Sequence, residues 1–268
     1  MSTPANPLLS DAFRIPFDRI SGEHVVPGVR AVLDEGRSRL EQLAGADDEP
    51  TWANTIEALE QLTQWVSERM TPVGHLLSVA ETTELRAAWN EVLPEVSQFW
   101  TRLTLHEGLW ARLKRYAATD EAAGLVGLHQ RHLERTLLEF RRSGADLERE
   151  ARARLEEVQV ELSRLSQKFS ENVLDATAEW GFVVDDEARL DGIPEGPKAR
   201  FQRAAEEADV DGWLLSLDHP SVEPVLKYAT DRELRREVYE AYTTRCREGD
   251  HDNRGLILDI LKLREGQA

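Results

Sequence analysis

The residues from Asp146 to Trp180 read DLEREARARLEEVQVELSRLSQKFSENVLDATAEW and carry the clearest helical pattern of the chain. Its apolar residues recur at steps of three and four, a spacing that places them on one side of an α-helix. The stretch contains no Pro and no Gly, the two residues that disfavour a helix interior most strongly. It therefore predicts a single helix of about 30 residues, roughly 45 Å long. The apolar stripe consists of Leu147, Ala151, Leu155, Val158, Leu162, Leu165, Phe169, Val173 and Ala176.

Shorter helical patterns come before this stretch. Asn54 and Glu57 have the spacing of a capping box, and the helix that they open is expected to end near Pro72. The next apolar stripe spans residues 85–103 and includes Pro94, which predicts a kink. A further helix is marked by Val126, Leu133, Leu137 and Phe140, and its end by Arg141, Arg142 and Gly144.

Two short apolar segments, 180–185 and 212–218, break the helical pattern, and each ends in Asp. Both are typical of β-strands. If they pair across a helix predicted for residues 198–208, they form a small two-stranded sheet, with a turn at 191–194. Helix is expected again after Pro224.

These patterns predict an all-α fold class, with long antiparallel helices and one small two-stranded β element. Four segments are expected along the chain. They are an extended amino-terminal segment at 1–20, a helical domain at 21–178 with the long helix starting at about residue 146, the small β element and its intervening helix at 179–224, and helices at 225–268.

The charge balance argues against one class of partner. The chain has 268 residues, of which 50 are acidic and 33 basic, giving a formal net charge of −17. Such a charge repels a phosphate backbone, so we expect no nucleic-acid partner. The same charge can attract basic peptides to a cleft, although a solvated surface is the commoner explanation.

The single cysteine, Cys246, leaves no partner for a disulfide within the chain, which fits a reducing compartment. The first seven residues lack a basic region followed by an apolar stretch, and no apolar run approaches the roughly 18 residues of a membrane span. We therefore expect a cytoplasmic protein with no membrane partner.

A metallopeptidase helix of the HExxH type needs two His on one face, with the Glu between them acting as base for a zinc-bound water. None of the seven His has this spacing. The nearest segment is 106–110, where Trp110 stands in place of the second His. We interpret His106 as the start of a helix.

Other candidates for chemistry are weaker. His129 and His132 could share a metal ion with Glu134 or Glu139, but an exposed, charged helix face explains these residues better. The sequence has no glycine-rich phosphate loop and no G-x-S-x-G elbow, and we interpret the lone Cys246 as a buried apolar residue.

Several segments, taken in order, resemble the oligopeptidase A family, which is similar to the thimet oligopeptidase and dipeptidyl carboxypeptidase group. The resemblance covers nearly the whole chain and is therefore more specific than any one motif. The segments are NPLL at 6–9, EHVVP at 23–27, TWAN at 51–54, PVGHLLSV at 72–79, HEGL at 106–109, FSENVLDAT at 169–177, LDHPS at 217–221, YEAYTTR at 239–245 and LKLR at 261–264.

The resemblance implies a helical, clam-like zinc peptidase that hydrolyses short peptides in a deep channel. The family's HExxH helix and its downstream Glu ligand lie in a carboxy-terminal half that this sequence does not contain. We therefore expect zinc in the full-length parent but no metal and no catalytic residue in this chain. Its expected partners are short peptides and the carboxy-terminal catalytic half of the same protein.

A second hypothesis is a free-standing helical module that binds peptides or proteins and has lost catalysis. The two hypotheses differ in the gene immediately after the codon for Ala268, which either continues in frame to an HExxH motif or reaches a stop codon.

Tyr239, Tyr242 and Arg245 recur at steps of three in a segment that resembles the family closely. On one helix face they could present hydroxyl and guanidinium donors to peptide carbonyl groups or to a terminal carboxylate. The alternative, which we favour on general grounds, is that both tyrosines pack inward while Arg245 either extends its charged end to solvent or pairs with Glu248.

Overall fold

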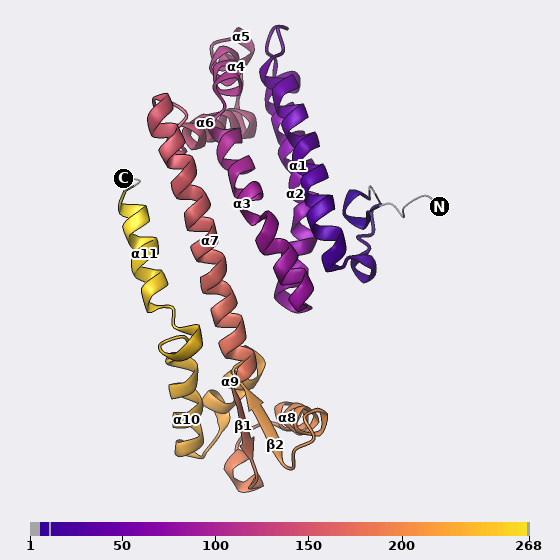
Figure 1. Cartoon of the computed structure of the whole chain (residues 1–268), viewed down its shortest axis with the longest axis vertical. Coiled ribbons are helices and arrows are strands. Elements are labelled where there is room, and N and C mark those ends of the chain that lie inside the picture. Colours follow the sequence, from indigo (N-terminus) through magenta and orange to yellow (C-terminus); the bar gives the residue numbers. More distant parts are fainter. Residues whose placement is uncertain (1–5, 11, 267–268) are drawn as a thin grey trace. The chain divides into compact units, whose positions relative to one another are not determined.

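The computed structural model describes residues 6–10 and 12–266, which fall into two compact units. Unit 1 extends to Arg164 and unit 2 runs from Leu165 to Gly266. The structure is 75% helical with one two-stranded antiparallel sheet, which confirms the predicted fold class (Figure 1). No helix among the described residues is both long enough and apolar enough to cross a membrane.

Unit 1 is built around three helices that lie side by side, α1 (Gly22–Ala44), α2 (Ala58–Val79) and α3 (Thr83–Leu105) (Figure 1). A side chain at Gly36 would come within 3.0 Å of the Phe99 ring and 3.1 Å of Val66, so this glycine lets α1 approach both neighbours closely. The remaining elements of unit 1 are the 3₁₀ turns η1 (Pro7–Leu9) and η2 (Phe17–Arg19), the π-helical segment η3 (Trp52–Glu57), α4 (Glu107–Ala117), α5 (Asp120–Ala123), α6 (Gly127–Arg142) and the first half of α7 (Arg149–Glu179).

The helix start predicted at Asn54 is wrong by about one turn. Thr51, not Asn54, is the cap: its hydroxyl accepts a hydrogen bond from the Asn54 amide, and the Asn54 side chain accepts one from the Thr51 amide. The end predicted near Pro72 is also wrong, because α2 continues to Val79. Proline removes a single backbone donor, and the burial of Met70, Pro72 and Val73 in the core stabilises the helix across it.

The long helix is confirmed, and α7 has 31 residues. It begins at Arg149 instead of about residue 146, because Gly144 has a φ of +96° and the Leu147 amide donates to the Gly144 carbonyl to close a turn. Asp146 lies in this turn and accepts a 2.8 Å hydrogen bond from the Trp110 indole. Gly144 ends α6 where it was predicted to end.

Unit 2 contains the second half of α7 and the predicted sheet. Strand β1 (Gly181–Val184) pairs antiparallel with β2 (Trp213–Ser216), with Val183 opposite Leu214. Helix α8 (Glu195–Glu207) connects the two strands and begins three residues before the predicted start. The sequence continues through α9 (His219–Tyr228), which already contains Pro224, then α10 (Arg232–Thr243) and α11 (Arg254–Glu265), with 3₁₀ turns at η4 (Glu187–Leu190) and η5 (Gly249–His251).

The core of unit 2 lies between the sheet and its helices, where Val184, Leu190, Phe201, Leu215 and Leu234 are buried. The division between the two units falls at residues 164 and 165, inside α7. The edge expected between residues 178 and 179 differs from this division and falls at the end of α7. The predicted segment 1–20 includes η1 and η2 among its described residues. The four-segment division stays a prediction.

Candidate functional site

The candidate peptide face belongs to α10 and to the loop that follows it, in unit 2. The first turn of α10 is capped by Asp231, whose Oδ1 accepts hydrogen bonds from the Glu233 and Leu234 amides at 2.8 and 3.2 Å. Arg189 donates to Asp231 at 2.8 Å and to Glu237 at 2.9 Å, and its hydrogen bond holds the pKa of Asp231 below the usual range. These contacts fix α10 against the rest of unit 2.

The two tyrosines of the face have different surroundings. Tyr239 is 57% exposed, whereas Tyr242 is half-buried and packs against the core of unit 2. The expectation that both tyrosines pack inward is therefore wrong for Tyr239. Its phenol is available to a ligand, while Tyr242 serves the packing.

Arg245 does not share a helix face with the tyrosines, because α10 ends at Thr243. Its guanidinium carbon lies 4.6 Å from the centre of the Tyr242 ring, and its Nη1 donates a 2.8 Å hydrogen bond to Thr177 Oγ1 on α7. These recorded contacts differ from the pairing expected with Glu248. The guanidinium has further N–H groups that Thr177 does not use, so Arg245 can bind a carbonyl or carboxylate while it stays held.

The loop that carries Arg245 is fastened to α7 by a buried polar cluster. Asn253, 2% exposed, accepts a hydrogen bond from Asn172 Nδ2 at 2.8 Å and donates one to the Phe169 carbonyl at 3.1 Å. The Asn253 amide also donates to the Cys246 carbonyl at 2.9 Å. The cluster holds the loop in one position beside α7.

Cys246 belongs to this cluster and is suited to structure instead of catalysis. Its thiol donates to the Asn172 carbonyl at 3.3 Å, and burial raises the pKa of the thiol. A reactive cysteine needs a lowered pKa. The prediction of a buried apolar residue is wrong in its burial, because Cys246 is only half-buried.

Two of the segments that carried the family resemblance, 169–177 and 239–245, meet at this face. The contact between Arg245 and Thr177 joins positions 68 residues apart in the chain. Sequence spacing suggested Arg245 and the tyrosines but could not place Thr177, Asn172 or Asn253, because nothing local links α7 to the loop.

The histidines singled out by sequence have other contacts. His106 is the N-cap of α4, as predicted, and its Nδ1 accepts from the Leu109 amide at 3.2 Å. His132 Nε2 lies 3.2 Å from Glu60 Oε1. The His129 ring meets the Trp52 ring edge-on, with 4.7 Å between the two ring centres. Among residues 6–10 and 12–266, no group of three or more His, Cys, Asp or Glu side chains is placed to hold a metal ion.

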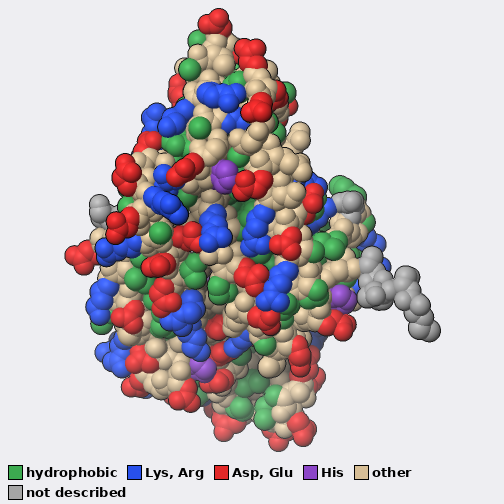
Figure 2. All heavy atoms as spheres, turned by 45° about the horizontal axis from the view of Figure 1, so that its top comes forward, with side chains coloured by type: hydrophobic (Ala, Val, Ile, Leu, Met, Phe, Trp, Pro, Cys, Tyr) green, Lys and Arg blue, Asp and Glu red, His purple; other side chains and the backbone are tan. Residues whose placement is uncertain are grey.

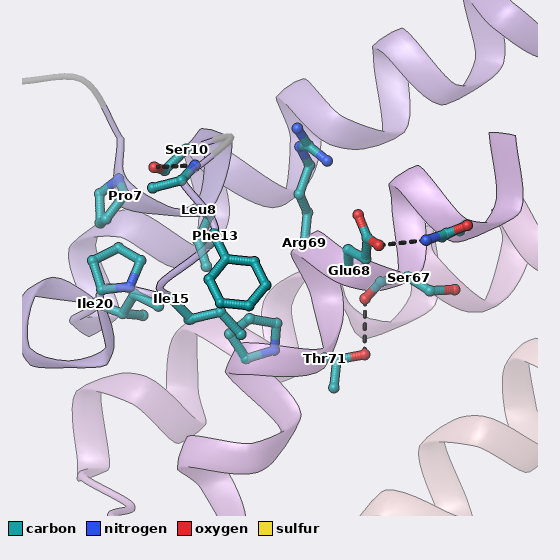
Figure 3. Close-up of a pocket in the computed structure, with 14 residues that line it drawn as sticks. Pro7, Leu8, Ser10, Phe13, Ile15, Ile20, Ser67, Glu68, Arg69 and Thr71 are labelled. Atoms are coloured by element: carbon teal, nitrogen blue, oxygen red, sulfur yellow. Dashed lines mark hydrogen bonds between the residues drawn. The ribbon is translucent and has the colours of Figure 1, made fainter. Parts of the chain in front are cut away.

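A pocket of about 570 Å³ in unit 1 was not foreseen from the sequence. The amino-terminal segment forms one wall with Leu8, Phe13 and Ile15, and α2 forms the other with Glu68 and Thr71 (Figure 3). Thr71 is held on its helix by a 2.8 Å hydrogen bond to the Ser67 carbonyl. The prolines at positions 7 and 16 are the only local signal for this wall, and they predict irregular backbone without predicting a cavity.

The acidic excess is not gathered over one region of the face drawn in Figure 2, where acidic and basic side chains are interspersed. Among the described residues, many charged side chains pair locally, as Arg164 does with Glu161 and Arg236 with Glu240. This arrangement is the one expected of a solvated surface.

Residues 29–152 match the family described as Neurolysin/Thimet oligopeptidase, N-terminal domain. The chain is therefore similar to the amino-terminal domain of this family.

Three of the similar proteins are oligopeptidases A. "Probable cytosolic oligopeptidase A" of Arabidopsis thaliana is 39% identical over 98% of this chain and 38% of its own length. "Oligopeptidase A" of Escherichia coli strain K12 is 36% identical over 98% of this chain and 39% of its own length. "Organellar oligopeptidase A, chloroplastic/mitochondrial" of Arabidopsis thaliana is 37% identical over 98% of this chain and 34% of its own length. The chain therefore spans less than two fifths of the length of these relatives.

Proposed function

We propose that this chain forms one wall of the peptide channel in a cytoplasmic, zinc-dependent oligopeptidase that hydrolyses short peptides. The zinc ion and the catalytic groups belong, in this proposal, to a carboxy-terminal portion of the same protein, as the family resemblance implies. The observation that carries the proposal is the similarity to oligopeptidase A over 98% of the chain.

Within this function, we assign Tyr239 and Arg245 to peptide binding and Tyr242 to positioning. The exposed phenol of Tyr239 and the free N–H groups of Arg245 can donate to a peptide carbonyl or a terminal carboxylate. The Tyr242 ring lies against the Arg245 guanidinium and limits its motion. Planar donors held in place lose little freedom when a peptide binds.

Mutation tests this assignment in a protein that joins this chain to the remaining portion of E. coli oligopeptidase A. Loss of a hydrogen bond from a charged donor costs about 1.5–3 kcal/mol, so Arg245→Ala is expected to raise KM for a short peptide by about 10- to 100-fold. Tyr242→Phe keeps the ring and serves as the matched control. If Arg245→Ala leaves KM unchanged, or lowers turnover only in step with the melting temperature, the peptide-binding role is wrong.

The division of labour between the two portions is tested separately. The chain alone is expected neither to hydrolyse peptides nor to retain stoichiometric zinc after dialysis, since a catalytic zinc needs about three protein ligands. The joined protein is expected to do both. A stop codon directly after the codon for Ala268 would favour the binding module instead.

A further inference from the structure

Helix α11 has an unusual distribution of apolar side chains. It carries six large aliphatic residues within Arg254–Glu265, yet none of its residues is buried. A surface helix normally turns a single apolar stripe toward the core and polar residues outward. The aliphatic residues are Leu256, Ile257, Leu258, Ile260, Leu261 and Leu263.

These side chains form two stripes at helical spacing. Leu256, Ile260 and Leu263 are half-buried on one side of α11. Ile257, Leu258 and Leu261 lie on another side and are 44%, 58% and 55% exposed. We call these three residues the exposed stripe. The polar side of the helix holds Asp259 and Lys262, whose charged groups are 3.5 Å apart.

The exposed stripe is held on a fixed support. Asn253, the N-cap of α11, gives its side chain to the buried contacts with Asn172 and the Phe169 carbonyl on α7. The Ile257 amide then donates to the Asn253 carbonyl at 2.9 Å, which starts the helix from this anchored residue. A stripe on an anchored helix is presented in one orientation, so a partner need not order it on binding.

We propose that the exposed stripe is the docking surface for the catalytic portion of the longer protein. This inference rests on the proposed function. The relatives support the choice of partner, because this chain covers only 38–39% of their length and most of each relative lies outside the match. A contiguous apolar stripe on a soluble protein marks an interaction surface, and a segment of the same polypeptide is present at high effective concentration.

Cysteine labelling tests the proposal directly. Leu261→Cys is made in the chain alone and in the chain joined to the remaining portion of E. coli oligopeptidase A, and the rate of maleimide labelling is measured by peptide mapping, which separates this position from Cys246. The matched control is Lys262→Cys, on the polar side of the same helix, where the side chain is 75% exposed. We expect the thiol at position 261 to react at least about tenfold more slowly in the joined protein, and the thiol at 262 to change by less than about twofold.

Equal rates at position 261 in both proteins overturn the proposal. So does slow, concentration-dependent labelling in the chain alone, since that result assigns the stripe to a second copy of the chain. Peptide hydrolysis is measured on the same joined protein. If the protein is active but the thiol at position 261 still reacts, the proposed function stands and the docking surface is wrong. If the thiol is protected but the protein is inactive, the docking surface stands and the proposed function fails. If the joined protein shows no cooperative melting, this chain and the remaining portion of E. coli oligopeptidase A are mixed as separate chains. If the two chains then do not bind each other, or the thiol at position 261 is not protected, the result counts against the docking surface.

Discussion

Replacing Asn253 by Ala tests the contact that fastens the end of unit 2 to α7. The side chain makes two hydrogen bonds in a buried place, one with the Asn172 side chain at 2.8 Å and one with the Phe169 carbonyl at 3.1 Å. A net hydrogen bond contributes about 1 kcal/mol, and a buried donor left without an acceptor costs about 1–3 kcal/mol. Asn253→Ala removes the hydrogen bond to the Phe169 carbonyl and leaves the side-chain Nδ2 of Asn172 without its acceptor. The expected loss is therefore about 2–4 kcal/mol.

Hydrogen exchange measures this loss where it occurs. Global unfolding of a chain with two compact units need not be two-state, whereas exchange of the amides in 244–265 reports local opening. A loss of about 2–4 kcal/mol corresponds to exchange roughly 30- to several-hundred-fold faster. Peptides from α1 should not change, because α1 lies in the other unit.

A control variant and a double variant separate the contribution of the Asn253 contacts from a general effect of mutation in the loop. Asp250→Ala changes an exposed residue of the same loop and should alter stability by less than about 0.5 kcal/mol. The double variant Asn172→Ala/Asn253→Ala should cost about 1–2 kcal/mol less than the sum of the single changes, because both remove the same hydrogen bond. Fully additive costs, or an exchange rate in 244–265 that rises less than about threefold, would refute the account of this cluster.

Two further predictions concern charged groups. Arg112 is buried and donates to the Ala46 carbonyl and to Asp48 at 2.8 Å each. Arg112→Leu should therefore lower the free energy of unfolding in urea by about 2–4 kcal/mol. The control is Arg115→Leu, which changes an exposed neighbour that donates to the Asp48 carbonyl and should cost less than about 1 kcal/mol. The pKa of Asp231 is lowered by Arg189, so this carboxylate stabilises the fold above its ordinary pKa of about 3.9, and the contribution is lost as the pH falls through the lowered value. Asp231→Asn keeps the helix cap but should lower the melting temperature at neutral pH and make its fall toward acid pH less steep. Asp185→Asn, a change at an exposed residue, should do neither. If the two variants have the same melting temperature at every pH, the Arg189 contact is not stabilising.

The sequence predicted best the elements whose signal is local and repeated. The α7 pattern continues over eight turns without Pro or Gly, so no other structure competes with the helix. The strands were predicted from short apolar runs, and their pairing followed because the intervening residues suit one helix. Gly144 marked the end of α6 because few other residues accept a φ of +96°.

The errors arose where tertiary packing outweighs a local signal. Pro72 lies within α2 because its neighbours are buried in the core of unit 1. Arg245 left the predicted helix face because α10 ends at Thr243 and Cys246 adopts a positive φ of 58° beside α7. The contacts with Thr177 and Asn172 that hold this loop span about 70 residues, and a single sequence carries no pattern that links such positions.

One anchored loop supports both surfaces that we propose. Arg245 and Cys246 lie at its start and Asn253 at its end, and the Asn253 amide closes the loop by donating to the Cys246 carbonyl. A change at Asn253 should therefore disturb the peptide face and the exposed stripe of α11 together. Arg245→Ala and a change at Leu261 should each affect one surface alone, because Arg245 contacts Thr177 and Tyr242 whereas Leu261 lies exposed on α11. A rise in KM with unchanged protection of α11 would thus locate a defect in peptide binding, whereas a change in both locates it in the loop.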